Sequence, residues 1–275
     1  MTAAPRTEEP TAPAPERPGL AQLVGAGALA GARAALGVYS VLVKTLYYLL
    51  RGVRQPGAVA RQMYAIGNES LVFLCVVMGF LGMIVVYQTG LQLQRVVPDL
   101  GMLGANFVDL LVRELVPSIC ALMLATRVGA GIAAEIGSMV VTEQVDALRM
   151  CAADPVDYLI KPRFVASVVM TLVLSTIAGT VAYVAGMLTA GTFFQITPNT
   201  FINLSLVGVG DAVSFLTKCV AYGAAIPVVS GYCGLVTYGG SEGVGWATTS
   251  AVVSSSLSVV VLDFFISGAC YLIFG

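Results

Sequence analysis

The sequence predicts an all-α, polytopic membrane protein with five transmembrane helices, an N-terminal interfacial helix and a short cytosolic helix between two of the spans. Of the 275 residues, 57% are hydrophobic and only 11% are charged, whereas soluble domains carry about 25% charged residues. Mean hydropathy is +0.89. Residues 70–94 contain no charge at all, and such a run is long enough to cross a ~30 Å hydrocarbon core.

Composition also argues against several functional classes. The chain has no histidine, so the commonest general base and metal ligand is missing, and we expect no metal site and no catalytic residues. Six cysteines form no CxxC pair, and five lie in apolar runs, where cysteine behaves as a small hydrophobic residue. The net charge is −1 and no basic groove is evident, so we expect no nucleic-acid partner.

The N-terminal region divides into two parts. Residues 1–18 are rich in proline and contain three glutamates, which predicts a disordered tail. Residues 19–62 are apolar but interrupted by basic residues, which favours an amphipathic helix in the cytosolic membrane interface. The alternative is a first span over 20–43, which would place Arg33 inside the membrane at a cost of ~2.5 kcal/mol or more.

The rest of the chain, residues 63–275, forms the predicted membrane domain. Breaks at prolines, glycines and charged residues divide it into spans at about 70–94, 106–134, 162–190, 211–237 and 247–274. Pro117 and Pro227 are expected to kink their helices, because proline lacks a backbone donor.

Basic residues set the predicted orientation. Nine lie in the N-terminal segment and within residues 127–163: Arg33, Lys44, Arg51, Arg54, Arg61, Arg127, Arg149, Lys161 and Arg163. Because the side richer in lysine and arginine is usually cytosolic, the N-terminus is predicted to be cytosolic. Five spans then place the C-terminus outside.

Small residues recur every fourth position in the second span, at Ala125, Gly129 and Ala133. They form one helix face on which another backbone can approach closely. The sequence does not separate packing within the subunit from a dimer seam.

Charged residues within the spans form a second candidate site. Arg113 and Glu114 lie near the outer end of the second span, and Asp211 and Lys218 lie in the outer part of the fourth, with Asp263 in the fifth. Charges in lipid are costly and mark functional candidates. We expect the first four to form a neutral polar cluster, which is either a salt-bridge network that holds helices together or a polar mouth for an amphiphile headgroup.

The loop between the second and third spans forms a short amphipathic helix in our interpretation. Glu135, Glu143 and Asp146 fall on one side, and Val141, Val145 and Leu148 on another. A charged face is usually only solvated. Here it interrupts a very apolar chain between two spans, which favours a docking element.

The same residues resemble a known family. The matching motifs are Arg113-Glu114-x-x-Pro117, Arg127-Val128-Gly129-x-x-Ile132-Ala133-Ala134-Glu135-Ile136-Gly137-x-Met139, Thr142-Glu143-Gln144-Val145-Asp146-Ala147-Leu148 and Glu242-Gly243-Val244-Gly245-x-Ala247-Thr248-Thr249. They are similar to the MlaE/YrbE permeases, and the resemblance covers roughly residues 40–275.

The resemblance implies the homodimeric permease subunit of an ATP-driven ABC-type transporter in the inner membrane. Such a transporter moves phospholipid or a related lipid between that membrane and the outer envelope. The implied partners are an ABC ATPase that binds ATP and Mg²⁺, a substrate-binding protein with an MCE domain, and a small STAS-domain protein in some systems. The implied ATPase-coupling helix contains Glu135, Gly137, Met139, Thr142, Glu143, Gln144, Asp146 and Leu148, and the implied lipid path passes Arg113, Glu114 and Lys218.

Two other functions compete with this interpretation. An ion-coupled secondary transporter of an amphiphile would favour repeated halves and carboxylates at mid-membrane, and we find no internal repeat. An intramembrane enzyme would need a GxSxG motif or a metal cluster, and neither occurs. The chain also lacks a P-loop, so ATP would have to be hydrolysed by a separate, catalytic subunit.

Overall fold

The computed structural model describes residues 20–52, 56–96, 102–203 and 205–274, and in these ranges all regular structure is helical. The predicted tail, residues 1–18, lies outside the described residues. Five long helices dominate the fold: α1 (Leu20–Arg51), α2 (Pro56–Val96), α7 (Lys161–Phe194), α9 (Val209–Leu235) and α10 (Gly240–Phe274).

The second predicted span, 106–134, lies in a helical stretch that runs from residue 103 to 141. It consists of α3 (Leu103–Leu110), the π-helical turn η1 (Leu111–Leu115), α4 (Val116–Leu124), a second π-helical turn η2 (Ala125–Gly129) and α5 (Ala130–Val141). The shorter elements are α6 (Gln144–Met150), η3 (Val156–Ile160) and α8 (Pro198–Phe201).

Among the described residues, four helices are long and apolar enough to cross a membrane: Gly57–Arg95, Val156–Phe194, Val209–Leu235 and Gly240–Ile273. They contain the first and third predicted spans, and they cover the fourth and fifth except for one or two residues at the C-terminal end of each. The α3–α5 stretch carries Arg113, Glu114 and Arg127 and is divided by its π turns, so the fifth crossing stays a prediction.

The helices extend beyond the predicted spans. The first span was expected to begin at residue 70, but α2 begins at Pro56. Charged residues such as Arg61 and Glu69 are compatible with a helix in water, because they cost little helix propensity. Charge therefore marks the edge of the apolar segment rather than the end of the helix.

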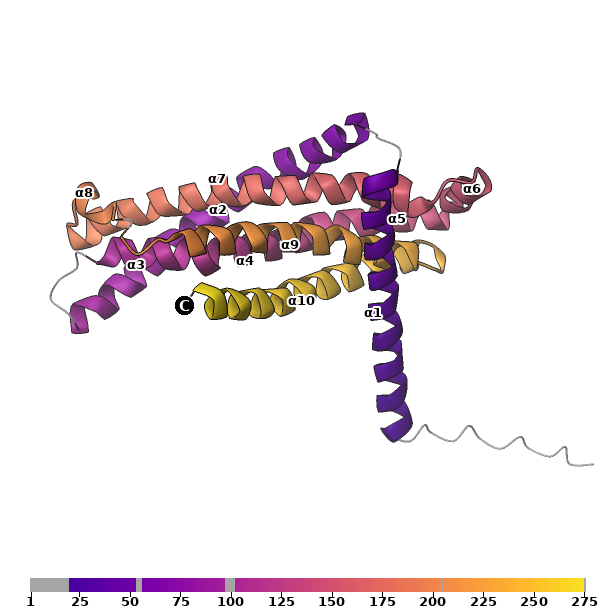
Figure 1. The fold of residues 1–275 in the computed structure, drawn as a ribbon, viewed down its shortest axis with the longest axis horizontal. Helices are drawn as coiled ribbons and strands as arrows, with labels where there is room; N and C mark the ends of the chain where they lie inside the picture. Colours follow the sequence, from indigo (N-terminus) through magenta and orange to yellow (C-terminus); the bar gives the residue numbers. More distant parts are fainter. Residues whose placement is uncertain (1–19, 53–55, 97–101, 204, 275) are drawn as a thin grey trace, which may run out of the picture.

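The long helices form a bundle in which α2, α7, α9, α10 and the α3–α5 stretch run roughly side by side, whereas α1 crosses one end almost at a right angle (Figure 1). α2 packs along α7, and α9 lies between α7 and α10. The α6 segment projects beyond the bundle at the end crossed by α1, and α8 lies at the opposite end (Figure 1). The crossing direction of α1 agrees with a helix in the membrane interface.

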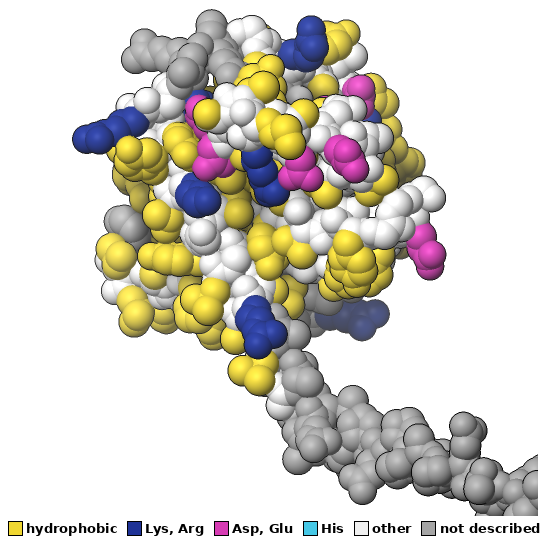
Figure 2. All heavy atoms as spheres, turned by 90° about the vertical axis from the view of Figure 1, so that its right-hand side faces the viewer, with side chains coloured by type: hydrophobic (Ala, Val, Ile, Leu, Met, Phe, Trp, Pro, Cys, Tyr) yellow, Lys and Arg dark blue, Asp and Glu magenta, His cyan; other side chains and the backbone are white. Residues whose placement is uncertain are grey.

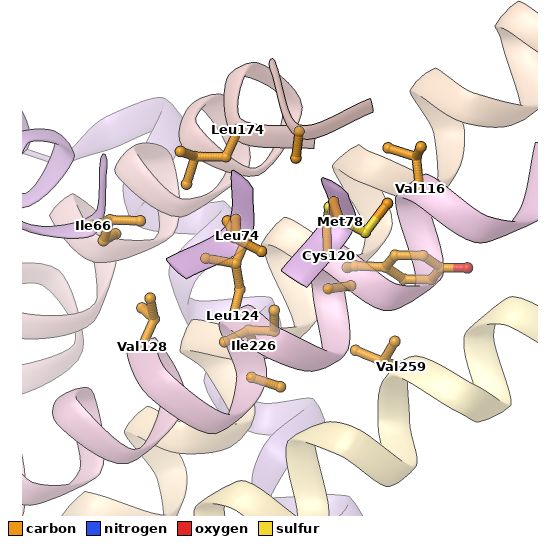
Figure 3. Close-up of a cluster of buried hydrophobic side chains, with 14 of the residues drawn as sticks. Ile66, Leu74, Met78, Val116, Cys120, Leu124, Val128, Leu174, Ile226 and Val259 are labelled. Atoms are coloured by element: carbon orange, nitrogen blue, oxygen red, sulfur yellow. The ribbon is translucent and has the colours of Figure 1, made fainter. Parts of the chain in front are cut away.

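The core lies around α4 and η2, which are surrounded by α2, α7, α9 and α10 (Figure 3). Its buried side chains include Leu74, Met78, Val116, Cys120, Leu124, Leu174, Ile226 and Val259. The second predicted span thus lies in the middle of the bundle.

Large apolar side chains also cover the outside of the bundle. Val72, Val76, Phe80 and Ile84 recur every fourth residue along α2, and all are more than half exposed. α10 presents Val253, Leu257, Phe264 and Phe265 in the same way. A soluble protein rarely exposes such continuous apolar faces, whereas lipid tails solvate them well, so these faces identify a multi-pass membrane protein.

Candidate functional sites at the two ends of the bundle

A buried ion-pair network joins three helices. Lys218 on α9 is fully buried, and its Nζ donates to Glu114 Oε2 at 2.7 Å and lies 3.0 Å from Asp263 Oδ1. One lysine thus faces two carboxylates, from η1 and from α10. Opposite charges in a low-dielectric site attract strongly, and removal of one partner leaves the other charge buried without compensation.

Two hydroxyl groups complete this Lys218 network, which we define as Glu114, Lys218, Tyr222, Asp263 and Ser267. Tyr222 donates its hydroxyl to Asp263 Oδ1 at 2.6 Å, and Ser267 Oγ donates to Glu114 Oε1 at 3.1 Å. The pairs 218/222 and 263/267 are each four residues apart, so each pair lies on one helix face.

Pro117 explains a further contact of Lys218. Proline has no N–H, so the carbonyl four residues earlier loses its usual helical donor. That carbonyl belongs to Arg113, and Lys218 Nζ donates to it at 2.9 Å. The turn just before the proline is the π-helical turn η1. The expected disturbance at Pro117 therefore takes the form of a π turn whose free carbonyl is satisfied by another helix.

The structure divides the four residues of the predicted polar cluster. Glu114 and Lys218 belong to the Lys218 network, whereas the side chains of Arg113 and Asp211 line a separate pocket of about 400 Å³ with Asp109. Consecutive helical residues point about 100° apart, so Arg113 and Glu114 face different neighbours. Asp211 also accepts a hydrogen bond from the Gly208 backbone N–H at 2.8 Å, at the start of α9.

At the other end, α5 leads through a tight turn into α6. Glu143 forms the turn with φ of 60°, a left-handed conformation that is uncommon outside glycine and asparagine. Val145 is buried and seats α6 on the bundle, whereas Glu143, Gln144 and Asp146 are exposed. Thr142 Oγ1 donates to the Ser138 carbonyl at 2.8 Å, and Asp146 pairs with Arg149 of its own helix, at 2.9 Å. This segment, residues 135–150, is called the surface segment below.

The surface segment is fixed to the bundle at its beginning. Glu135 Oε2 lies 2.8 Å from Nη2 of Arg163, which is almost fully buried at the start of α7. A Cβ atom added to Gly137 would lie 3.0 Å from Thr237 Oγ1, so glycine allows close packing there. Met139 and Leu148 are half-buried against the core. Figure 2 shows this end of the molecule, where basic and acidic side chains lie among apolar ones.

The small-residue face of the α3–α5 stretch packs inside the chain. Ala125 and Ala133 are fully buried. A Cβ atom on Gly129 would lie 2.9 Å from Ser230 Oγ on α9 and 3.3 Å from Ser255 Oγ on α10. Contacts within the subunit therefore account for all three residues.

The sequence interpretation left Asp263 outside the polar cluster and did not include Tyr222 or Ser267. The i, i+4 spacing of 218/222 and 263/267 was a signal for both pairs. The partnership of Glu135 with Arg163 was also missed, although the predicted spans placed both residues at the same boundary.

The described residues thus form an all-helical membrane bundle with an ion-pair network around a buried lysine and an exposed charged segment between two long helices, features that suit a membrane transport subunit. A model of the family described as Permease MlaE matches residues 59–269. The chain therefore belongs to the MlaE permease family.

Relatives agree with this assignment. A probable ABC transporter permease protein of Synechocystis is 34% identical over 222 residues, which cover 80% of this chain and 84% of that protein. A protein of the same description from Rickettsia typhi is 36% identical over 76% of this chain and 81% of its own length. The chloroplast protein TRIGALACTOSYLDIACYLGLYCEROL 1 of Arabidopsis thaliana is 40% identical over 56% of this chain and 45% of its own length.

Proposed function

We propose that the chain is the non-catalytic permease subunit of an ATP-driven ABC-type transporter that moves phospholipid or a related lipid between the inner membrane and the outer envelope. The observation that carries the proposal is the family match over residues 59–269, together with the description of relatives as probable ABC transporter permeases. Because the sequence has no P-loop, ATP and Mg²⁺ bind to a separate ATPase subunit.

The surface segment is the proposed docking site for that ATPase. Its exposed carboxylates, Glu143 and Asp146, can accept charge-assisted hydrogen bonds from arginine or lysine of a partner. Its buried side chain, Val145, and the Glu135–Arg163 ion pair join it firmly to the bundle. A displacement of α6 by the bound ATPase is therefore transmitted to α5 and α7.

The lipid path is proposed to pass the opposite end of the bundle. The pocket lined by Asp109, Arg113 and Asp211 offers one cation between two carboxylates, and a phospholipid headgroup has a phosphate that arginine binds well. The Arabidopsis relative bears the name of a galactosylated diacylglycerol, which supports a diacyl lipid as the class of substrate.

The proposal includes a homodimer in the inner membrane, with the N-terminus in the cytosol. α10 offers an apolar surface that is exposed in the single chain, at Val253, Leu257, Phe264 and Phe265. Lipid or a second copy can cover this surface, and the proposal assigns part of it to the second copy. An MCE-domain protein on the outer side, and a STAS-domain protein in some systems, would complete the transporter.

Transport in reconstituted vesicles tests the proposal. The permease and its ATPase are co-reconstituted, and release of a labelled phospholipid to an acceptor protein is measured with ATP, without ATP, and with an ATPase variant that cannot hydrolyse it. We expect release only with hydrolysis. Release driven by an ion gradient in the absence of ATP would contradict the proposal and favour a secondary transporter instead.

The orientation has its own test. A reporter fused after Gly275 should be extracytoplasmic, and a reporter inserted within residues 150–158 should be cytosolic. A cytosolic C-terminus would mean that the number of spans is even.

A further inference from the structure

A second polar pocket lies at the end of the bundle crossed by α1. Its volume is about 550 Å³, and it is enclosed by α1, by the loop that follows α6, and by the last turn of α9. Its polar lining comes from Ser40 and Lys44 of α1, Arg149 of α6, and Asp154 of the loop. It is separate from the pocket around Arg113, and the transport proposal does not use it.

The charge available in this pocket is positive. Lys44 is exposed and forms no ion pair with any described residue, and Arg149 pairs with Asp146 while its side chain stays 60% exposed. Asp154 is already occupied, because Oδ1 accepts the Val156 N–H and Oδ2 accepts the Tyr48 hydroxyl, both at 2.9 Å. The hydrogen bond to Asp154 raises the pKa of Tyr48, so the tyrosine remains a donor. These hydrogen bonds leave the Asp154 carboxylate charged, so Lys44, Arg149 and Asp154 together give the pocket lining one net positive charge. Lys44 is the cation that can meet an added anion without first giving up an ion pair to a described residue.

α1 carries an apolar surface next to these cations. Leu36, Tyr39, Val43 and Leu50 are between 45% and 87% exposed. They recur at spacings of three, four and seven residues and form one stripe. Ser40 and Lys44 lie on the neighbouring face, while Val41 and Thr45 are buried against the bundle. The helix therefore offers apolar area and a positive pocket side by side, which is the arrangement of an interfacial lipid-binding helix.

We propose that this pocket binds the phosphate headgroup of an anionic phospholipid from the membrane leaflet at this end of the bundle, with the acyl chains along the exposed stripe of α1. Basic pockets between helices near the membrane surface suit such headgroups. The lipid is a bound structural partner, not the transported molecule. It ties α1 to the loop after α6 and so holds the surface segment in place. The inference rests on the proposed function only in taking this leaflet to be the cytosolic one.

An anionic residue of the ATPase is the competing occupant, since the pocket adjoins the surface segment. The apolar stripe favours the lipid: a soluble subunit would leave Leu36 and Leu50 facing water, whereas a lipid covers them.

The test measures lipid retention by the full-length permease without its ATPase. The protein is placed in nanodiscs made from equal amounts of phosphatidylglycerol and phosphatidylcholine, extracted into mild detergent, and analysed by native mass spectrometry. We expect wild type to retain phosphatidylglycerol in preference, and Lys44→Gln/Arg149→Gln to lower that preference about 25-fold, since each surface cation contributes roughly five-fold.

Three variants serve as controls. Lys44→Arg keeps the charge and should keep the preference. Arg33→Gln removes an exposed cation of the same helix that does not line the pocket, and it should also keep the preference. Arg113→Gln alters the proposed transport site, so an unchanged preference there separates the two lipid sites.

Three results would overturn the inference. The first is equal retention of both lipids by wild type, and the second is an unchanged preference in the double variant. The third is that inorganic phosphate, in nanodiscs of phosphatidylcholine alone, protects the protein from heat as well as phosphatidylglycerol does, which would show that a free anion suffices. If the double variant keeps the lipid preference but no longer co-purifies with the ATPase, the pocket belongs to the ATPase. None of these results bears on ATP-driven transport by wild type, so the proposed function stands or falls separately.

Discussion

The Lys218 network and the surface segment both gather charged residues, but they differ in what surrounds the charges. In the network, a fully buried lysine holds two carboxylates and a backbone carbonyl from other helices. In the surface segment, Asp146 pairs with Arg149 of its own helix, and both side chains are about 60% exposed. Buried charges whose partners lie on other helices hold those helices together, whereas exposed charges with partners on their own helix are available to bind another protein.

The largest effect should follow from Lys218→Ala. The substitution leaves Glu114 and Asp263 facing each other without a cation, and breaking a buried pair costs about 3–5 kcal/mol. We expect a much lower unfolding temperature in detergent and poor recovery from membranes. The variant Glu114→Gln/Lys218→Met/Asp263→Asn, which removes all three charges, should recover most of the loss. A Lys218→Ala protein as stable as wild type would contradict the view that the Lys218 network stabilises the bundle.

Glu114→Ala should have a smaller effect, because Lys218 keeps Asp263 and the Arg113 carbonyl as acceptors. Losing a hydrogen bond to a charged group costs about 1.5–3 kcal/mol. We expect impaired lipid transport while the ATPase still co-purifies. Normal transport by all four single alanine variants at Arg113, Glu114, Asp211 and Lys218 would exclude both a headgroup role and a structural role.

Gly129→Leu tests the packing between the two charged regions. The new side chain meets Ser230 and Ser255, and overpacking costs typically 1–3 kcal/mol. Ala133→Leu should act in the same direction. Gly131→Leu is the matched control, because a Cβ atom there has nothing within 4 Å. Unfolding temperatures that rank Gly131→Leu below Gly129→Leu would contradict the packing.

The smallest effect on stability, and the largest on assembly, is expected for Glu143→Lys/Asp146→Lys. Both sites are exposed, so the free energy of unfolding should change by no more than about 0.5 kcal/mol. Recovery of the ATPase with the permease should nevertheless be lost. Glu143→Asn/Asp146→Asn is a control that keeps a residue suited to φ of 60° and removes only charge. Equal ATPase recovery from wild type and the lysine variant would contradict the docking assignment and would mean that Glu143 and Asp146 are merely solvated.

The sequence predicted the helical class and the apolar segments well, because lipid solvation demands long uninterrupted apolar runs. Pro117 could also be predicted to disturb its helix. The identity of the donor that satisfies the Arg113 carbonyl could not, because it depends on how α9 is rotated and placed against η1.

The candidate sites were predictable only in part, because the sequence gives the spacing of residues along one helix but not the contacts between helices. Residues of one helix face, such as Glu143 and Asp146, follow from spacing alone. Contacts between helices, such as Lys218 with Asp263 or Glu135 with Arg163, depend on helix rotation and depth. The split between Arg113 and Glu114 was available from the 100° step between helical neighbours, whereas the separate pocket that receives Arg113 was not.

The hydrogen bond from Lys218 to the Arg113 carbonyl also has a mechanical consequence. Because a proline leaves a backbone carbonyl without its helical donor, the two halves of the helix can usually bend relative to each other at that site, which then acts as a hinge. Here the Arg113 carbonyl is bound by the Lys218 ammonium group of α9. The same group also binds Glu114 of η1 and Asp263 of α10. If this end of the bundle opens, α9 and α10 must therefore move together with η1 as one rigid unit. Otherwise, the Lys218 ammonium group must first separate from the three oxygen atoms that it contacts.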